Sequence, residues 1–588
     1  MSKSRKYYLL GMKWVSEHSS PYQSIIVLSV AIGLLSGIAA ITLKSLIHFI
    51  ESYGVGFFPS YLFFLTPVTG ILIVVFLNQN IFGKAAAFHG IGDIITSIRR
   101  KSSVIDFTLT YVKLITSAIT VGLGGSSGLE SPIVVTGSAI GSNVARFFRL
   151  DVNYKSLFIG CGAAAGISAI FNAPIAGVVF AMEVLMPRFT ATYFIPVLLS
   201  SASGALLAEI FSPSSIFSVP QLEWKFVLHQ LPFIVTLGVL GGLVSFYFTR
   251  MSWISKTVFS KIRNPYSRGI VGGALLGALV FCFPRLYGEG YVGIRSLFLT
   301  SGYELLPPIF SNIPLALSWA LPLTFFALFI LKPIAATITI HAGGEGGHFA
   351  PSFITGGYLG YFFFLVAGMF FPSLQLSAPV FILLGMSSVL SGVMHAPLTG
   401  IFLIAEITGG YELFVPLMVV SALGFLTKYA FEKQPIHFHR GESPLAGSKE
   451  LAVLDTIELL NLADHDYLTI QPTQSLREML PVLTGSKRNF FPVLDEQNNL
   501  LGIITLDDLR PVMFDTARYD VVFAKDLMHM PSASLQWDER LVSALEKFDR
   551  TGYWNLPVVR NGKFAGFISK STILDRLRKE VDRNQEIF

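Results

Sequence analysis

The pattern of hydrophobic and polar residues divides the chain near residue 440. Before that point, long apolar stretches alternate with short polar ones. The apolar stretches cover residues 25–50, 63–76, 107–121, 133–147, 157–186, 193–211 and 228–248, and continue to about residue 431. Several are shorter than the roughly 20 residues that a helix needs to cross a bilayer. Short helices interrupted by glycine and proline are typical of channels and transporters, in which broken helices end at a site inside the membrane.

Composition supports a membrane protein with a soluble tail. Apolar residues make up 52% of the 588 residues and the mean hydropathy is +0.60, which exceeds what a soluble protein carries. Of the 80 charged residues, 38 lie between Lys449 and Phe588. We therefore expect a cytoplasmic segment over 1–22, a membrane domain over 23–440 with halves at about 23–211 and 228–432, a linker over 441–455, and soluble domains over 456–518 and 519–588.

Charge and motifs exclude several classes of function. The net charge of +6 reflects basic residues at the N-terminus and in short loops, as the positive-inside rule requires, and does not indicate nucleic-acid binding. The N-terminus has no cleavage site, so we predict a retained segment and not a signal peptide. Cys161 and Cys282 lie in apolar stretches, which predicts neither a disulfide framework nor a metal site. No HExxH or Gly-x-Ser-x-Gly motif supports an enzyme.

The membrane domain contains an internal repeat. Residues 112–132 (VKLITSAITVGLGGSSGLESP) align without gaps on residues 331–351 (LKPIAATITIHAGGEGGHFAP), at an offset of 219 that matches Lys113 with Lys332. Residues 162–184 align on residues 385–407 at an offset of 223, which pairs Glu183 with Glu406. Internal repeats in transporters place the substrate site between the two halves. The two Gly-rich turns should therefore converge on one pathway.

One carboxylate lies in the first of these turns. The segment GGSSGLESP, residues 124–132, contains Glu130 and leads into the helix predicted from Pro132. A charge at membrane depth is costly and indicates a function, and the free amides of a helix N-terminus form an anion site. Close packing of small residues explains the stretch GAAAGISAIFNAPIAG, but it does not explain a carboxylate. Neither turn ends in the Gly-Lys-Ser/Thr sequence of a P-loop, which excludes a phosphate-binding loop of that type.

These segments resemble the CLC family of chloride channels and proton/chloride exchangers over nearly the whole chain. GGSSGLESP resembles the family's G-R/K-E-G-P segment, GGHFAP resembles its G-x-F-x-P segment, and HGIGDI more weakly resembles its G-S-G-I-P turn. The resemblance implies an all-α membrane domain with an inverted repeat, and a homodimer with one pore in each subunit. No cofactor is required, and chloride or another small monovalent anion is the transported ligand. We expect an integral protein of the cell membrane, with both termini in the cytoplasm.

The resemblance also implies roles for individual residues. Glu130 becomes the gating glutamate, which occupies the outer anion site when ionised and leaves it when protonated or displaced. The remaining members of the implied anion path are Leu129, Ser131, His89, Gly90, Gly347, His348, Phe349 and His437. Backbone amide dipoles attract a weakly hydrated anion without the tight hold of a fixed cation.

The chain departs from the family pattern at four places. Leu129 and Ser131 replace the usual basic residue and glycine beside the glutamate, which weakens anion attraction. His89 replaces the pore serine, and His437 lies near the inner-gate tyrosine. Each of these histidines is equally well a packing residue; if both line the pore, conduction depends on pH near neutrality. Val184 replaces the inner glutamate that exchangers carry after Glu183.

Valine cannot carry a proton, so Val184 favours passive conduction. Our first hypothesis is thus a voltage- or pH-gated chloride channel opened at Glu130. The alternative is a proton/chloride antiporter in which Glu183 or His437 supplies a non-standard proton path. A third hypothesis is a nucleotide-sensing regulator that uses its membrane part as an anchor. Selectivity among chloride, bromide and nitrate stays open, and fluoride is disfavoured because the turn lacks the asparagine-rich form of fluoride exporters.

The tail contains two similar units. Residues 488–510 and 553–577 each predict strand, turn, strand and helix, and each resembles the core of a CBS domain. In the family's ribose-binding signature, Thr or Ser is followed three residues later by Asp; Thr505 and Asp508 fit, whereas Ser569 is followed by Thr572. The resemblance allows one adenine-nucleotide site, and the alternative is a purely structural or dimerising pair.

Overall fold

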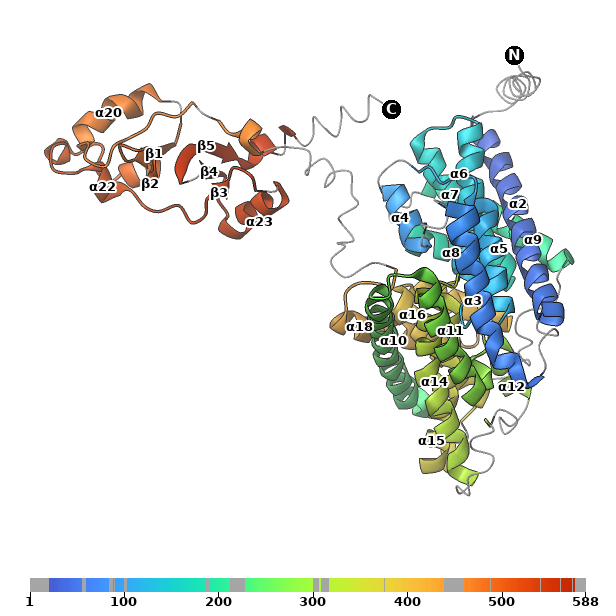
Figure 1. The fold of residues 1–588 in the computed structure, drawn as a ribbon. Coiled ribbons are helices and arrows are strands. Elements are labelled where there is room, and N and C mark those ends of the chain that lie inside the picture. Colours follow the sequence, from blue (N-terminus) through green and yellow to red (C-terminus); the bar gives the residue numbers. More distant parts are fainter. Residues whose placement is uncertain are drawn as a thin grey trace, which may run out of the picture. The chain divides into compact units, whose positions relative to one another are not determined.

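The chain folds into two compact units, Met1–Glu442 and Ser443–Phe588, and each is described by itself (Figure 1). The computed structural model describes residues 21–54, 60–83, 88, 90–99, 103–186, 191–211, 228–299, 306–307, 317–374, 376–437, 459–464, 466–486, 488–539, 541–560, 562–573 and 575–576. His89 lies outside the described residues.

The first unit is built from helices. Its first half contains α2 (Pro21–Phe49), α3 (Thr66–Leu77), α4 (Ile91–Arg99), α5 (Leu109–Gly122), α6 (Glu130–Phe147), α7 (Val152–Phe171), α8 (Pro174–Phe180) and α9 (Ala191–Phe211). Its second half contains α10 (Leu231–Ser260), α11 (Pro265–Cys282), α12 (Tyr291–Leu299), α14 (Leu317–His341), α15 (Phe349–Phe370), α16 (Ala378–Met394), α17 (Pro397–Thr408) and α18 (Phe414–Phe431). Among the described residues, nine helices are long and apolar enough to cross a bilayer. The predicted fold of many membrane helices, several of them short, is confirmed.

The two halves repeat the same local structure. Helices α7 and α16 end at Asn172 and His395, which both adopt φ of +55°. A proline then begins the next helix in each half, at Pro174 of α8 and Pro397 of α17, where its missing N–H costs nothing. The left-handed residue reverses the chain and the proline restarts it, so each broken helix has the same cause in both halves.

Glycines let the central helices pack closely in both halves. A methyl group at Gly137 of α6 would lie 2.1 Å from the carbonyl oxygen of Gly162 in α7. At the equivalent positions, a methyl group at Gly356 of α15 would lie 2.3 Å from the carbonyl oxygen of Gly385 in α16. Such distances leave no space for a side chain. The small residues of this region thus serve helix packing, as the sequence indicates.

The second unit contains two small sheets. Strands β1 (Phe490–Leu494) and β2 (Leu500–Thr505) pair antiparallel and lead into α21 (Leu506–Leu509). Strands β4 (Asn555–Arg560) and β5 (Lys563–Ser569) also pair antiparallel, and β3 (Leu535–Gln536) runs parallel to β4. The remaining named helices are α20 (Leu476–Gly485), α22 (Ala524–Leu527) and α23 (Leu541–Thr551). The predicted order of strand, turn, strand and helix is present in both CBS-like segments of the tail.

Two core contacts of the tail cross the predicted boundary at residue 519. Leu459 and Leu462, which we assigned to the first soluble domain, pack in the core that contains Leu556 and Ile568 of the second. Ala524, assigned to the second domain, packs in the core that contains Phe491. Burying these apolar side chains favours an exchange of segments across the boundary, which a linear division of the sequence does not represent.

Candidate functional site

The two Gly-rich turns meet at the centre of the membrane unit. Gly128 of the first turn and Gly347 of the second exchange two backbone hydrogen bonds: the Gly128 N–H donates to the Gly347 carbonyl at 3.0 Å, and the Gly347 N–H donates to the Gly128 carbonyl at 2.8 Å. These glycines are equivalent in the repeat alignment. The expected convergence of the turns is therefore found, and it brings the start of α6 next to the start of α15.

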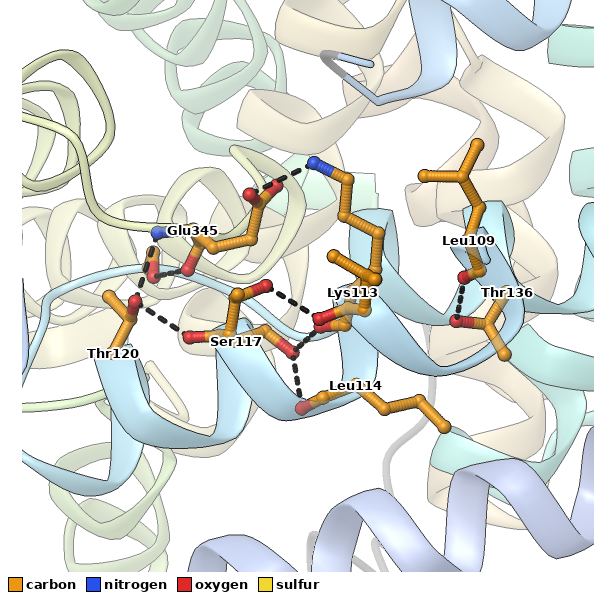
Figure 2. A network of polar contacts seen from close by, with 10 residues as sticks. Leu109, Lys113, Leu114, Ser117, Thr120, Thr136 and Glu345 are labelled. Atoms are coloured by element: carbon orange, nitrogen blue, oxygen red, sulfur yellow. Dashed lines mark hydrogen bonds and ion pairs between the residues drawn. The ribbon is translucent and has the colours of Figure 1, made fainter. Parts of the chain in front are cut away.

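Threonines of the helices that precede the two turns accept hydrogen bonds from the backbone of the turns. The Ser126 N–H donates to Thr339 Oγ1 of α14 at 3.0 Å, and the Glu345 N–H donates to Thr120 Oγ1 of α5 at 2.9 Å. The repeat relates the two donors to each other and the two acceptors to each other, so each half holds the turn of the other. Figure 2 shows the bond between Glu345 and Thr120. Reciprocal bonds of this kind position both turns together.

Two buried lysines also reach across the repeat, but they meet different partners. Lys113 Nζ of α5 lies 2.9 Å from Glu345 Oε2, and the lysine side chain is 2% exposed (Figure 2). The equivalent Lys332 Nζ of α14 donates to Ser126 Oγ and to the Gly288 carbonyl, both at 2.8 Å. One lysine thus forms a buried ion pair, whereas the other bonds to neutral oxygens.

Glu130 lies between the two turns as the first residue of α6, and it is fully buried. The Tyr291 hydroxyl of α12 donates to Oε1 at 2.7 Å, and the Ala350 N–H donates to Oε2 at 3.3 Å. Ala350 belongs to the first turn of α15, where amides have no partner within the helix. The carboxylate therefore occupies a position at the N-terminus of α15 that suits a small anion.

A cavity of about 860 Å³ approaches this position from one side. Its lining includes five of the predicted anion-path residues, Ser131, Gly347, His348, Phe349 and His437. Its lining also includes Pro265 and Arg268 at the start of α11 and Ile436 in the segment after α18. We call this the tail side, because the chain continues from α18 into the second unit.

The other predicted path residues lie nearby. Leu129 is buried and caps α6, and His348 caps α15. Gly90 has a φ of +102°, and a methyl group on it would lie 2.8 Å from Ser131 Oγ. Gly90 therefore approaches the start of α6, although it does not line the cavity.

Glu183 has a structural role in the described structure. Its two carboxylate oxygens accept from the N–H groups of Leu398 and Thr399 at the start of α17, at 3.0 and 2.8 Å. Glu406 of α17 binds the start of α8 in the same way, through Ile175 and Ala176 at 2.8 and 2.7 Å. Each carboxylate stabilises the positive end of the other half's helix. This capping engages both carboxylate oxygens of Glu183, the residue that the sequence offers for a proton path, in binding a helix N-terminus.

Thr505 and Asp508 form a capping box at the start of α21. Thr505 N–H donates to Asp508 Oδ2 at 2.7 Å and Asp508 N–H donates to Thr505 Oγ1 at 3.4 Å. His529 Nδ1 lies 3.3 Å from the same Oδ2 atom. The predicted nucleotide-binding pair thus stabilises a helix N-terminus.

Sequence reasoning missed several residues of the site. Tyr291 and Ala350 contact Glu130 directly. Ala350 lies in the GGHFAP segment but at its variable position, and Tyr291 lies in no motif that the sequence analysis identified. Lys113 and Lys332 were matched by the repeat but given no role. His341 joins His348 and His437 in lining the cavity; a conspicuous histidine content in the second half was the available signal.

Comparisons with known proteins agree with this architecture. A family model described as voltage gated chloride channel matches residues 69–429, and a CBS domain model matches residues 460–515 and 524–579. The H(+)/Cl(-) exchange transporter ClcA of Vibrio cholerae is 26% identical over 442 residues, which cover 72% of this chain and 90% of that protein. ClcA of Salmonella arizonae is 27% identical over 418 residues, covering 68% and 84%.

Solved structures share the fold. A slow cyanobacterial Cl-/H+ antiporter matches with a TM-score of 0.58 at 22% identity, over 71% of this chain and 97% of that one. A CLC-type fluoride/proton antiporter matches with a TM-score of 0.60 at 21% identity, over 71% and 99%. A eukaryotic CLC transporter matches with a TM-score of 0.57 at 17% identity, over 93% and 97%.

Proposed function

Because the chain belongs to the voltage gated chloride channel family, called CLC, we propose that it is a secondary active transporter that exchanges chloride for protons across a membrane. Curated relatives that match most of its membrane unit are named H(+)/Cl(-) exchange transporters. This favours the exchanger alternative over the passive channel that Val184 suggested. Valine at that position removes one proton carrier, but it does not remove the others near the site.

The position of the Glu130 carboxylate is the observation that carries this proposal. It is buried at the N-terminus of α15, in contact with Tyr291 and the Ala350 amide. An ionised carboxylate there competes with chloride for the same amide dipoles. A protonated carboxyl loses that attraction, so chloride binding and Glu130 protonation favour each other. Such linkage between an anion and a proton at one position is what exchange requires.

Histidines of the tail-side cavity supply a proton route in place of the inner glutamate. His341, His348 and His437 line it together with the first turns of α6 and α15. The rings of His341 and His348 lie 6.4 Å apart, and His348 Nδ1 is buried without a hydrogen-bond partner among the described residues. An imidazole carries protons near neutral pH. His348 is also the N-cap residue of α15, two residues before Ala350, whose N–H donates to the Glu130 carboxylate.

The same cavity attracts the anion. Lys256 and Arg268 line it, and the only acidic residue in its lining among the described residues, Glu345, is paired with Lys113. A concave site lined by net positive charge raises the local concentration of an anion. Homodimer formation and adenine-nucleotide binding at the tail stay predictions.

Reconstituted transport tests the proposal. In liposomes that contain the full-length protein, an imposed proton gradient should drive chloride against its own gradient, with protons moving in the opposite direction. Chloride flux that collapses to equilibrium with no accompanying proton flux would show a passive channel instead. His348→Gln, which keeps a hydrogen-bonding side chain but no titratable group, should slow proton flux by about tenfold or more.

A further inference from the structure

The turn between α11 and α12 contains a carboxylate that the site described above does not use. Glu289 lies in the sequence Gly288-Glu289-Gly290-Tyr291, immediately before α12. Its Oε1 atom is buried and has no hydrogen-bond partner among the described residues. Burying a carboxylate oxygen without a partner is costly. Such an atom in a native protein therefore calls for a function.

The turn is bound directly to the Glu130 site. The Gly288 N–H donates to the Gly124 carbonyl of the first Gly-rich turn at 3.4 Å, and the Gly288 carbonyl accepts from Lys332 Nζ at 2.8 Å. Tyr291, two residues after Glu289, donates its hydroxyl to Glu130. The position of Glu289 relative to Glu130 is thus fixed by bonds on both sides of it.

Charged groups from four elements face Glu289. They are Glu130 of α6, Lys332 of α14, Lys44 of α2 and Glu51 of the π-helical turn Ile50–Gly54. Together with Glu289 the cluster contains three acids and two lysines, so one bound proton balances its charge. A proton shared between Glu130 and Glu289 leaves one negative charge on the pair, and the two lysines stabilise that charge whichever carboxylate bears it.

Glu289 lies on the opposite side of Glu130 from the histidine cavity. That cavity is lined by Pro265 and Arg268 at the start of α11, whereas Glu289 follows the end of α11 at Cys282. A helix of 18 residues is about 27 Å long. We call the side of Glu289 the far side. A proton that reaches Glu130 from the tail-side cavity must leave on the far side for exchange to occur.

A turn with the same backbone geometry precedes α4 in the first half. Gly90 and Gly290 have φ of +102° and +100°, and each carbonyl accepts from the N–H of an isoleucine four residues later, Ile94 or Ile294, at 3.4 Å. In sequence, Glu289 precedes Gly290 as His89 precedes Gly90. Each half thus has a titratable residue before the equivalent glycine.

We propose that Glu289 exchanges the proton with Glu130 on the far side, which rests on the exchange function proposed above. No hydrogen bond joins the two carboxyls, and the Glu289 Oε1 atom has no partner among the described residues, so the proton passes through an intervening water molecule. The O–H bond of the Glu130 carboxyl breaks as this water accepts the proton, and one O–H bond of the water breaks as an O–H bond forms on the Glu289 carboxylate. Glu289 then releases the proton to water on the far side. Glu130, ionised again, accepts hydrogen bonds from Tyr291 and Ala350. The same steps in reverse load a proton from the far side.

The test uses full-length protein in liposomes with separate proton and chloride measurements over a range of pH. Glu289→Gln should slow proton-coupled exchange by about tenfold or more and change its pH profile, and Glu289→Asp should recover most of the rate. Glu51→Gln removes a neighbouring charge and should change the rate less than about twofold. In a Glu130→Ala background, Glu289→Gln should leave chloride flux in place, which shows that the path is folded.

The outcomes separate this inference from the proposed function. If the wild type exchanges and Glu289→Gln has the same rate and pH profile, Glu289 is not the proton acceptor and the exchange function stands. If Glu51→Gln is as slow as Glu289→Gln, the effect is general electrostatics and the inference is overturned. If the wild type moves chloride without protons, the exchange function itself is wrong.

Discussion

The two Gly-rich turns have the same backbone frame and different side-chain chemistry. Residues 124–132 and 343–351 hold each other through bonds that the repeat relates in pairs. Yet Glu130 corresponds to Phe349, which packs against Phe171 and Phe180, and Ser126 corresponds to Glu345. The repeat thus supplies a symmetric backbone frame, and single residues make its two halves chemically different. The buried carboxylate lies in one half only, and its equivalent in the other half is an aromatic contact.

The largest expected loss of stability comes from replacing one of the two buried lysines, and the loss should differ between them. Lys113→Met leaves the Glu345 carboxylate without its partner in a largely buried place, which should cost about 3–5 kcal/mol. Lys332→Met removes bonds to neutral oxygens, while Lys44 still stabilises the charge shared by Glu130 and Glu289. The cost should therefore be about 1–3 kcal/mol. Thermal unfolding of the purified variants in detergent measures both. The double variant Lys113→Met/Glu345→Gln should recover much of the loss. A larger cost for Lys332→Met would contradict this ordering.

An intermediate effect, equal in the two halves, is expected at the close helix contacts. Gly137→Ala and Gly356→Ala each place a methyl group within 2.3 Å of a backbone carbonyl oxygen and should each destabilise by about 1–3 kcal/mol. Gly368→Ala is the matched control, because no atom lies within 4 Å of its new methyl group. Unfolding temperatures that differ strongly between Gly137→Ala and Gly356→Ala would show that the packing of the halves is not equivalent.

The smallest expected effect is at the reciprocal helix caps. Glu183→Gln and Glu406→Gln keep the shape of the side chain but remove the charge that binds the amides of α17 and α8. Each should cost about 0.5–2 kcal/mol and leave proton-coupled transport intact. A selective loss of proton flux in Glu183→Gln would restore Glu183 as a proton carrier, contrary to its capping role.

The sequence predicted the frame better than the contacts. Aligned glycines, prolines and lysines predicted the repeat, and the repeat predicted that the two turns meet, because matching residues at a constant offset indicate matching local structure. The partners of Glu130 could not be predicted, because Tyr291 lies 161 positions away and no spacing rule relates the two residues. The preference for a channel rested on Val184 alone. The exchanger alternative already named His437 as a proton carrier. That His341 and His348 line the same cavity could not be predicted, because the three residues come together only when α14, α15 and the segment after α18 are folded.

The central claim is that the Glu130 carboxyl couples chloride movement to proton movement, and one paired measurement tests it most directly. A chloride gradient across liposomes should drive protons uphill through the wild type. Glu130→Gln, which is similar in size but cannot bind or release a proton, should abolish proton movement while chloride still moves. Proton transport that persists in Glu130→Gln would contradict the account.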